Sequence, residues 1–312
     1  MGHIPKVAVG IPVYNGENYL GETLKLLLAQ TYEDFEIIVS DNCSTDRTRE
    51  LVLDHATSEP RLIYTCTDSN LGATPNFNRT FFLSRSPYFT WKAHDDRLQA
   101  NYLEKCVEVL DRDPEVVLSH TASVPINDRG EPLDFDPHKG CYVYEPGGYE
   151  VPKDWVHVAE GPDPIERFSE LLDETYFGMH IYGVVRRDSF AATGLYPSYY
   201  PCERCLLSKL ALMGRFSTLD EPLFARRVHA KSSCFMSAPE RFEYNDTANS
   251  PLSHAFPRLR AYITAPLQSP AISNRQRFRC LGRVAAATAQ SRWQKLGRRL
   301  QPARATKKAV YQ

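Results

Sequence analysis

The sequence predicts a doubly wound α/β fold, in which a mostly parallel sheet has helices on both faces. Three observations support this prediction: continuous apolar runs, amphipathic spacing between these runs, and a polar loop after each run. Continuous apolar runs are typical of strands that are buried on both faces of a parallel sheet. Strands that alternate regularly with helices form such a sheet through right-handed crossovers.

Predicted strands and helices alternate from the N-terminus onward. Lys6–Val13 is the first buried strand, and leucines at helical spacing follow it within Glu17–Gln30. Tyr88–Lys92, which is rich in aromatic residues, is a further strand, and Asn101–Leu110 again has helical spacing. The elements between them are a strand at 35–40, a helix through Leu51 and Val52, a strand at 61–66 and a helix that begins near Pro75.

Polar residues follow these predicted strands. Because the carboxyl ends of parallel strands meet at one edge of a sheet, we expect the loops to form a ligand-binding crevice. Carboxylates next to solvent suit Mg²⁺ or Mn²⁺, and a divalent ion suits a diphosphate. An alternative is that the two adjacent acids only cap the next helix. The residues concerned are Tyr14–Asn15, Asp41–Asn42, Asn70 and Asp95–Asp96.

Two common nucleotide-binding motifs do not occur in the sequence. No GxGxxG follows the first strand, and there is no GxxxxGK[ST]. A dinucleotide-binding fold and a P-loop are therefore disfavoured. If a nucleotide binds at this edge, a metal ion rather than a glycine cradle must hold its phosphates.

The composition indicates a cytoplasmic protein with an ample core. The chain has 312 residues, of which 42% are hydrophobic, enough for one large α/β domain or two small ones. Its eight cysteines are scattered through strand and helix patterns, which suggests free thiols in a reducing compartment. We expect no signal peptide before the first strand, and no window approaches the roughly 20 apolar residues of a membrane span.

The charge is distributed unevenly along the chain, although the net charge is only −1. After Asp246 there are thirteen Arg and Lys residues and no Asp or Glu. A basic extension on an acidic body suggests peripheral association with the inner face of an anionic membrane, which we favour over nucleic-acid binding. The alternative is a solvated tail. We also predict a helix at Arg277–Leu300, packed on the body in its first part, and disorder after about residue 301.

Several motifs in a fixed order give the chain a family resemblance. They include the loop after the first strand, the loop that begins at Asp41, and the segment His94–Asp96. In these motifs the chain resembles family-2 glycosyltransferases of the GT-A fold, which are inverting enzymes that use nucleotide sugars. The matching segments are Val9–Asn15, Glu17–Leu20, Val39–Asp46, Asn70–Gly72, Asn76, Asn78, His94–Asp96 and Tyr102–Glu104.

The resemblance implies a division of the chain into two parts. Residues 1–235 would form the GT-A domain, with a nucleotide-sugar-binding half at 6–120 and an acceptor-side half at 121–235. Residues 236–312 would form a basic, helical to partly disordered C-terminal extension. Within the acceptor-side half, residues 132–162 have little periodicity, and we predict a long loop there over the acceptor.

The resemblance also implies donor-binding residues. Asp41 would hydrogen-bond the base, and Asp95 would be the last acid of the DxD motif that holds a divalent metal, Mg²⁺ or Mn²⁺, on the diphosphate. Ala93 replaces the first acid of that motif, and one carboxylate binds a divalent ion more weakly than two. His94 would be an extra metal ligand or a sugar contact. The other donor-side residues would be Pro12, Tyr14 and Glu17 against the base and ribose, with Asn70 and Asp96 beside the diphosphate-binding loop.

The second half of the chain would supply a general base and cations. Glu203 lies where the family has a carboxylate base, more usually Asp; the alternative is a first-turn acid favoured by the helix dipole. Arg226, Arg227 and His229 would approach the diphosphate, and His229 would be either a metal ligand or a structural residue. Because Arg226 and Arg227 alternate across a strand, at most one of them can point into the crevice.

The sequence and the resemblance together predict an inverting glycosyltransferase. It would move a sugar from a nucleotide diphosphate, with a UDP- or dTDP-sugar favoured, to a hydroxyl acceptor in cell-surface polysaccharide or glycoconjugate biosynthesis. The acceptor could be a lipid-linked saccharide, a polysaccharide end or a small molecule. A non-catalytic nucleotide-sugar or glycan-binding protein of the same fold is the alternative, and Ala93 and Glu203 are the residues that favour it.

Overall fold

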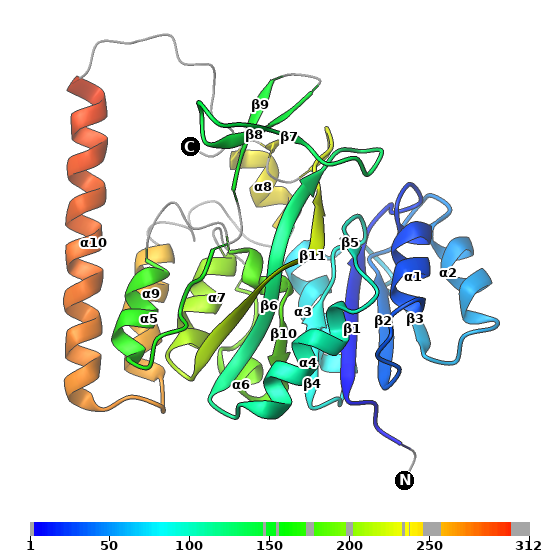
Figure 1. The fold of residues 1–312 in the computed structure, drawn as a ribbon, viewed down its shortest axis with the longest axis horizontal. Coiled ribbons are helices and arrows are strands. Elements are labelled where there is room, and N and C mark those ends of the chain that lie inside the picture. Colours follow the sequence, from blue (N-terminus) through cyan, green and yellow to red (C-terminus); the bar gives the residue numbers. More distant parts are fainter. Residues whose placement is uncertain are drawn as a thin grey trace.

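An eight-stranded sheet forms the centre of the molecule in the computed structural model (Figure 1). The structure describes residues 3–145, 148–153, 156–172, 178–197, 202–232, 235–236, 238–245 and 257–300. The strand order is β3 (Leu62–Cys66), β2 (Phe35–Asp41), β1 (Val7–Val13), β4 (Tyr88–Trp91), β10 (Val184–Arg186), β6 (Val116–Ile126), β11 (Arg215–Arg227) and β5 (Arg97–Leu98).

The strand directions place most of the carboxyl ends at one edge of the sheet. Strands β3, β2, β1 and β4 pair in parallel, and β6 pairs in parallel with β11. Strand β10 runs antiparallel to both β4 and β6, so these two point the same way. The prediction of a doubly wound, mostly parallel sheet is confirmed, and the polar loops do gather at one edge.

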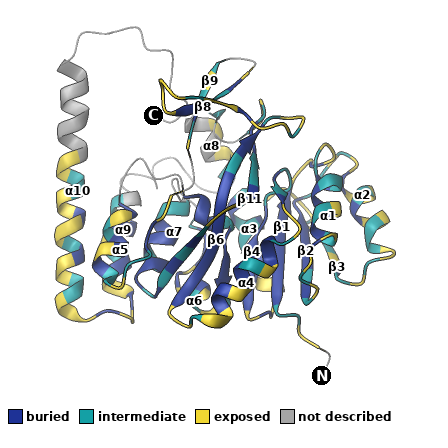
Figure 2. Cartoon of the chain, viewed as in Figure 1, coloured by how far each residue is buried: buried dark blue, intermediate teal, exposed yellow. Residues whose placement is uncertain are grey.

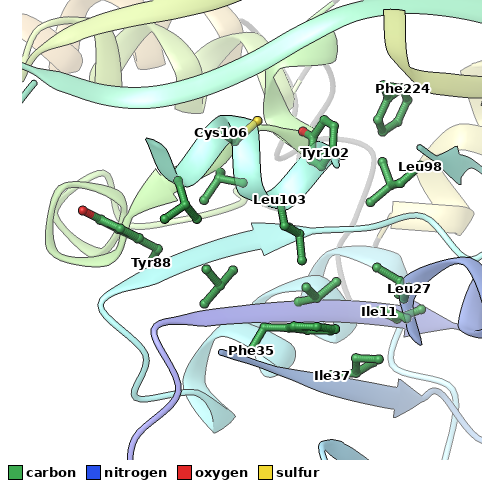
Figure 3. Close-up of a cluster of buried hydrophobic side chains, with 14 of the residues drawn as sticks. Ile11, Leu27, Phe35, Ile37, Tyr88, Leu98, Tyr102, Leu103, Cys106 and Phe224 are labelled. Carbon is green, nitrogen blue, oxygen red and sulfur yellow. The ribbon is translucent and has the colours of Figure 1, made fainter. Parts of the chain in front are cut away.

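Helices cover both faces of the sheet. On one face they enclose a cluster that includes Val52 and Leu103, part of which is drawn in Figure 3. On the other face they enclose Phe81, Phe190 and Leu207. Figure 2 shows that the central strands are mostly buried, as continuous apolar runs require. The helices are α1 (Leu20–Leu28), α2 (Thr48–Ala56) and α4 (Tyr102–Arg112) on the first face, and α3 (Ala73–Leu83), α6 (Arg187–Ala192) and α7 (Cys202–Ala211) on the second.

The predicted long loop at 132–162 was wrong in part, because a second small sheet forms there. Strands β7 (Asp134–Asp136), β8 (Cys141–Tyr144) and β9 (Tyr149–Pro152) pair antiparallel. Each strand has only three or four residues, too few for a two-residue alternation to stand out in the sequence. Figure 1 shows this sheet at the carboxyl ends of β6 and β11.

Residues 179–186 contain a turn followed by a short strand. Met179–Tyr182 forms a single 3₁₀ turn, η1, and only β10 is extended. The turn begins after Gly178, whose φ of 76° favours glycine, and the Ile181 N–H donates to the Gly178 carbonyl. A Cβ on Gly183 would lie 2.8 Å from the Ser119 carbonyl oxygen, so only glycine fits between the turn and β6.

The C-terminal region packs beside helices α5 and α7. Helix α10 confirms the predicted helix, and its first part buries Cys280 and Val284 against the neighbouring helices. Arg279 and Arg283 pair with Asp163 and Glu166 of α5. The predicted disorder after residue 301 lies outside the described residues. In the part of the chain that the structure covers, no helix is long and apolar enough to cross a membrane. The helices of this region are α5 (Pro164–Glu170), α8 (Ala238–Asn245), α9 (Pro257–Gln268) and α10 (Asn274–Leu300).

Buried Asn42 joins two of the polar loops at the carboxyl edge. Its Nδ2 donates to Asn70 Oδ1 at 2.8 Å and to the Gly72 carbonyl at 3.0 Å, and its Oδ1 accepts from the Leu71 N–H at 2.9 Å. These bonds hold the loop after β3 against the loop after β2. The geometry of this edge is therefore fixed by buried polar contacts as well as by strand pairing.

Replacing Asn42 by Ala should lower the free energy of unfolding by about 2 kcal/mol, because the backbone N–H of Leu71 and the buried carbonyl of Gly72 lose their partner. Urea denaturation measures this change. The same substitution at exposed Asn18 serves as the control and should change stability by less than about 0.5 kcal/mol. Equal losses at the two positions would show that the Asn42 contacts are not stabilising.

Candidate active site

The two adjacent acids after β4 have different environments. The Asp95 side chain is 17% exposed, and its Oδ2 lies 3.0 Å from His229 Nε2. Asp96 is buried, and its Oδ1 accepts from the Arg227 backbone N–H at 2.8 Å. Asp95 therefore turns toward His229 and remains partly accessible, whereas Asp96 anchors the end of β11.

Their environments also separate the pKa values of the two acids. Burial, reinforced by the charge of Asp95, raises the pKa of Asp96 to about 7. Burial alone would raise the pKa of Asp95, but the hydrogen bond with His229 and nearby positive charges hold it below its usual range. Asp95 is consequently the carboxylate that keeps its negative charge at neutral pH.

Lys92 holds the acid loop from inside the protein. It is buried, and its Nζ donates to the carbonyls of Ala93 and Asp96, each at 2.7 Å. Burial lowers the pKa of Lys92 to about 8. From the other side, Thr23 Oγ1 donates to the His94 carbonyl at 2.8 Å. We did not predict Lys92 as a site residue from the sequence. The one feature that could have indicated it is a charged residue at the end of an aromatic strand.

Arg227 is placed differently from the expectation that it approaches the diphosphate. Its side chain is only 1% exposed, and its guanidinium already contacts protein groups at every nitrogen. Nε donates to the Asp95 carbonyl at 2.7 Å, Nη1 to the Asp128 carbonyl at 2.8 Å, and Nη2 to Glu22 Oε2 at 2.5 Å. Of the two arginines, Arg227 points toward the acid loop, as the alternation along β11 requires. Arg226 is half-buried, and its contact with the diphosphate stays a prediction.

Tyr19 connects Arg227 with His229. The Tyr19 ring lies 5.2 Å from the His229 ring, and the Arg227 guanidinium carbon lies 4.6 Å from its centroid. A cation over an aromatic face is stabilised by the ring quadrupole. Tyr19 lies inside a matching segment, Glu17–Leu20, but its neighbours gave no sign that it would touch the histidine.

On the nucleotide side, Asp41 is buried at the end of β2. Its Oδ1 accepts from the Ser44 N–H at 2.9 Å, and its Oδ2 accepts from the Tyr64 hydroxyl at 2.7 Å. Burial and the Asp41 carboxylate raise the pKa of Tyr64 well above its ordinary value, so this phenol remains a donor. Both Asp41 oxygens thus orient the loop around it, and a bond from Asp41 to the base stays a prediction.

The other predicted donor-side residues lie around the same loop. Pro12 is buried in β1 beside Ser40, whereas Tyr14 and Glu17 are exposed at the end of that strand. Glu17 Oε2 accepts from the Arg47 N–H at 3.2 Å. Figure 1 shows β1 and β2 side by side, so these positions border one edge.

His94 and Asn70 have more local roles in the structure. Asn70 Oδ1 accepts from the Asn42 side chain and from the Gly72 N–H, so it shapes its own loop. The His94 ring lies against Gly16, where a Cβ would come within 3.0 Å of His94 Cδ2. Burial lowers the pKa of His94, which favours the neutral imidazole.

Glu203 lies in the first turn of α7. It is half-buried, and a Cβ on Gly178 would lie 3.1 Å from its own Cβ. Tyr182 links it to the acids: burial raises the pKa of this phenol, and the charges of Asp96, Asp95 and Glu203 raise it further. Tyr182 also stacks on Phe224 at 5.7 Å. Sequence reasoning had not singled out Tyr182.

Asp95 and His229 fit part of a metal site. Two neighbouring ligands of an octahedral ion, each about 2.1 Å from it, lie about 3 Å apart. The separation of Asp95 Oδ2 from His229 Nε2 is 3.0 Å. Among the described residues no group of three His, Cys, Asp or Glu side chains could hold a metal ion. Any ion here would therefore take its other ligands from the diphosphate and water.

Solved structures resemble this arrangement over most of the chain. The S. aureus TarS fragment 1–349 aligns with a TM-score of 0.60 and 15% identity, covering 91% of this chain and 72% of that one. The mannosyltransferase PcManGT of Pyrobaculum calidifontis, solved with GDP-Man and Mn²⁺, aligns with a TM-score of 0.52 and 17% identity, covering 94% and 80%. The fold is that of GT-A glycosyltransferases.

Sequence comparison identifies the family. The model of glycosyl transferase family 2 matches residues 8–190, which is more than half of the chain. The chain therefore belongs to glycosyl transferase family 2.

Curated relatives match part of this chain. An uncharacterized glycosyltransferase of Rickettsia typhi is 34% identical over 108 residues, which cover 35% of this chain and 33% of the relative. The putative teichuronic acid biosynthesis glycosyltransferase TuaG of Bacillus subtilis is 28% identical over 130 residues, covering 42% and 51%. The matched region thus spans between a third and about half of these relatives.

Replacing Arg227 by Met should lower the free energy of unfolding by about 3 kcal/mol, because buried carbonyls and the Glu22 carboxylate lose their donor. Arg97 also bonds Glu22 but is 30% exposed, so Arg97→Met should cost only about 1 kcal/mol or less. Urea denaturation of both variants measures the difference. Equal losses would contradict the buried anchoring role of Arg227.

Proposed function

We propose that the protein is an inverting glycosyltransferase that uses a nucleotide-diphosphate sugar, with a UDP- or dTDP-sugar favoured. The observation that carries the proposal is the Asp95–His229 pair at the carboxyl edge of the sheet. Support for a uridine donor comes from TarS, which has been solved with UDP-GlcNAc. That likeness is at 16% identity, so the donor of this chain is part of the proposal.

The donor diphosphate would lie between the acid loop and β11. Asp95 and His229 would hold a divalent metal, Mg²⁺ or Mn²⁺, which supplies positive charge to the leaving diphosphate when bound. A neighbour of this chain, PcManGT, was solved with Mn²⁺. Lys92 and Arg227 would keep the loop in place, since both are bonded to its carbonyls.

Glu203 would act as the general base. In an inverting transfer the acceptor hydroxyl attacks the anomeric carbon from the face opposite the diphosphate, and its proton must be taken up during the attack. Glu203 would accept that proton. Burial and the charges of Asp96, Asp95 and Glu203 all raise the pKa of Tyr182. Because burial and acidic neighbours keep Tyr182 protonated, its hydroxyl would donate to the sugar or the acceptor.

The wider role would be in cell-surface polysaccharide or glycoconjugate biosynthesis. The name of the Bacillus subtilis relative TuaG refers to teichuronic acid biosynthesis, which supports this direction. Cations after Asp246 other than Arg279 and Arg283, which pair within the protein, would hold it on the inner, anionic face of a membrane, near a lipid-linked acceptor. We propose a cytoplasmic location with this peripheral attachment.

A non-catalytic nucleotide-sugar-binding protein is the second candidate. Ala93 in place of the first acid, and Glu203 in place of the usual Asp, are the features that favour it. Turnover separates the candidates, because even slow hydrolysis of a nucleotide sugar requires a working site.

Replacing Asp95 by Asn should abolish stabilisation by the donor in the presence of Mn²⁺. Loss of a metal ligand should also lower transfer by at least about 100-fold, since second-shell changes alone cost about 10–100-fold. A thermal-shift panel of nucleotide sugars with Mn²⁺, Mg²⁺ or EDTA measures binding. Exposed Asp54→Asn is the control. If the donor stabilises the protein equally with and without EDTA, and equally in the Asp95→Asn variant, the metal assignment is contradicted.

Replacing Glu203 by Gln should leave donor binding unchanged but lower kcat by about 100-fold or more, because general-base catalysis contributes on that scale. The measurement combines the thermal shift with steady-state transfer or hydrolysis. Glu108→Gln, on the exposed face of α4, should keep full activity. A Glu203→Gln variant that turns over normally would point to a different base.

A further inference from the structure

One face of the small sheet carries an unusual concentration of aromatic side chains. In its register Phe135 lies opposite Tyr142, and Tyr144 lies opposite Tyr149. Since alternate residues of a strand share a face, these four rings are on the same side of the sheet. We call them, together with Phe235, the aromatic face.

The opposite side of the sheet carries acidic residues beside Cys141 and Val143. Asp136 and Glu150 lie on it, and both pair with Lys139 from the β7–β8 turn. The two sides therefore meet different surroundings: charged groups face solvent on one side, and rings face the body of the protein on the other.

The rings of the aromatic face contact one another across the sheet. Phe135 and Tyr142 are 5.1 Å apart, and Tyr149 and Phe235 are 4.6 Å apart, while Phe235 stacks on Tyr144 at 5.7 Å. Tyr144 is buried, but Phe135 is 48% exposed and Tyr149 is 40% exposed. Two large rings thus remain accessible at the borders of an otherwise packed surface.

The aromatic face is continuous with the candidate active site. Tyr144 packs in one cluster with Val228, which immediately precedes His229. Figure 1 shows the small sheet at the ends of β6 and β11, beyond the edge that carries the acid loop. The aromatic face therefore borders the end of β11, next to His229.

We propose that the aromatic face binds a saccharide acceptor, with pyranose rings packed on Phe135 and Tyr149 and the reacting hydroxyl directed toward Asp95 and Glu203. This inference rests on the proposed glycosyltransferase function and adds the chemical class of the acceptor. A pyranose has an apolar C–H face and a rim of hydroxyls. It matches rings that offer an apolar surface and a phenolic tip. A lipid chain would instead favour a continuous aliphatic groove, and here the exposed side chains are aromatic.

The test uses the full chain and four probes: cellohexaose, maltohexaose, chitohexaose and mannohexaose. Saturation-transfer NMR measures binding without any donor, and hydrolysis of a nucleotide sugar by water reports the donor half separately. We expect at least one hexasaccharide to bind. Phe135→Ala and Tyr149→Ala should each weaken that binding about fivefold, the scale of one lost ring contact. Hydrolysis should stay within about twofold of the unsubstituted protein.

Two further variants make the result specific. Tyr149→Phe keeps the ring and should restore most of the binding lost in Tyr149→Ala. Phe82→Ala removes an exposed ring of α3, outside the small sheet, and should leave binding unchanged. If the hexasaccharide is an acceptor, Phe135→Ala should raise its KM and leave kcat nearly constant.

Three outcomes would overturn the acceptor inference: no hexasaccharide binds, the alanine variants bind as well as the unsubstituted protein, or decanol competes fully with the saccharide for the aromatic face. Failure of the proposed function has a different signature. In that case no nucleotide sugar stabilises the unsubstituted protein, and the protein hydrolyses none of them. Saccharide binding by the unsubstituted protein and by the variants can still be measured.

Discussion

The buried guanidinium of Arg227 joins the segments that form the candidate site. It bonds the carboxylate of Glu22 on α1, the carbonyl of Asp95 in the acid loop, and the carbonyl of Asp128 in the turn after β6. Only a rigid planar fork with several donors can satisfy three such acceptors at once, which lysine cannot do. Because Arg227 already holds the loop by its backbone, the Asp95 carboxylate is left to face His229.

The adjacent carboxylates show how one short loop serves both stability and chemistry. Asp96 is buried and receives a backbone hydrogen bond, and its raised pKa reflects the cost of charging it there. Asp95, one residue earlier, is paired with His229 and stays ionised. Two like groups thus have different properties because their surroundings differ, as in many active sites.

The replacement of the first acid by Ala93 is accompanied by a buried lysine directly before it. Lys92 donates hydrogen bonds to the carbonyls of Ala93 and Asp96, at the two ends of the turn. Thr23 donates to the carbonyl of His94 between them. These contacts come from the protein alone, so the loop is shaped before any ion or diphosphate binds. Such preorganisation lowers the entropy that binding would otherwise cost, and it offsets part of the loss of a carboxylate ligand.

Local patterns in the sequence were sufficient for the first strands and for the shared edge of their polar loops. The apolar runs at β1, β2 and β4 are buried for the reason that predicted them, and the acids follow β4 as expected. Local patterns were insufficient for the small sheet and the turn at η1, whose short segments are stabilised by packing on β6, Val228 and Phe235.

Only the tertiary structure decided the separate roles of Arg226 and Arg227, and of Asp95 and Asp96. Sequence limited Arg226 and Arg227 to one inward-pointing residue, but the choice depends on Glu22, which lies 205 positions away. In the same way, His229 bonds Asp95 but not Asp96, although it lies 134 positions from Asp95 in the sequence. The partners of Lys92 are backbone carbonyls, which no residue type in the sequence reveals. Periodicity sets which face of a strand is buried. It carries no information on the distant groups that meet a side chain there, and those groups determine its charge and its role.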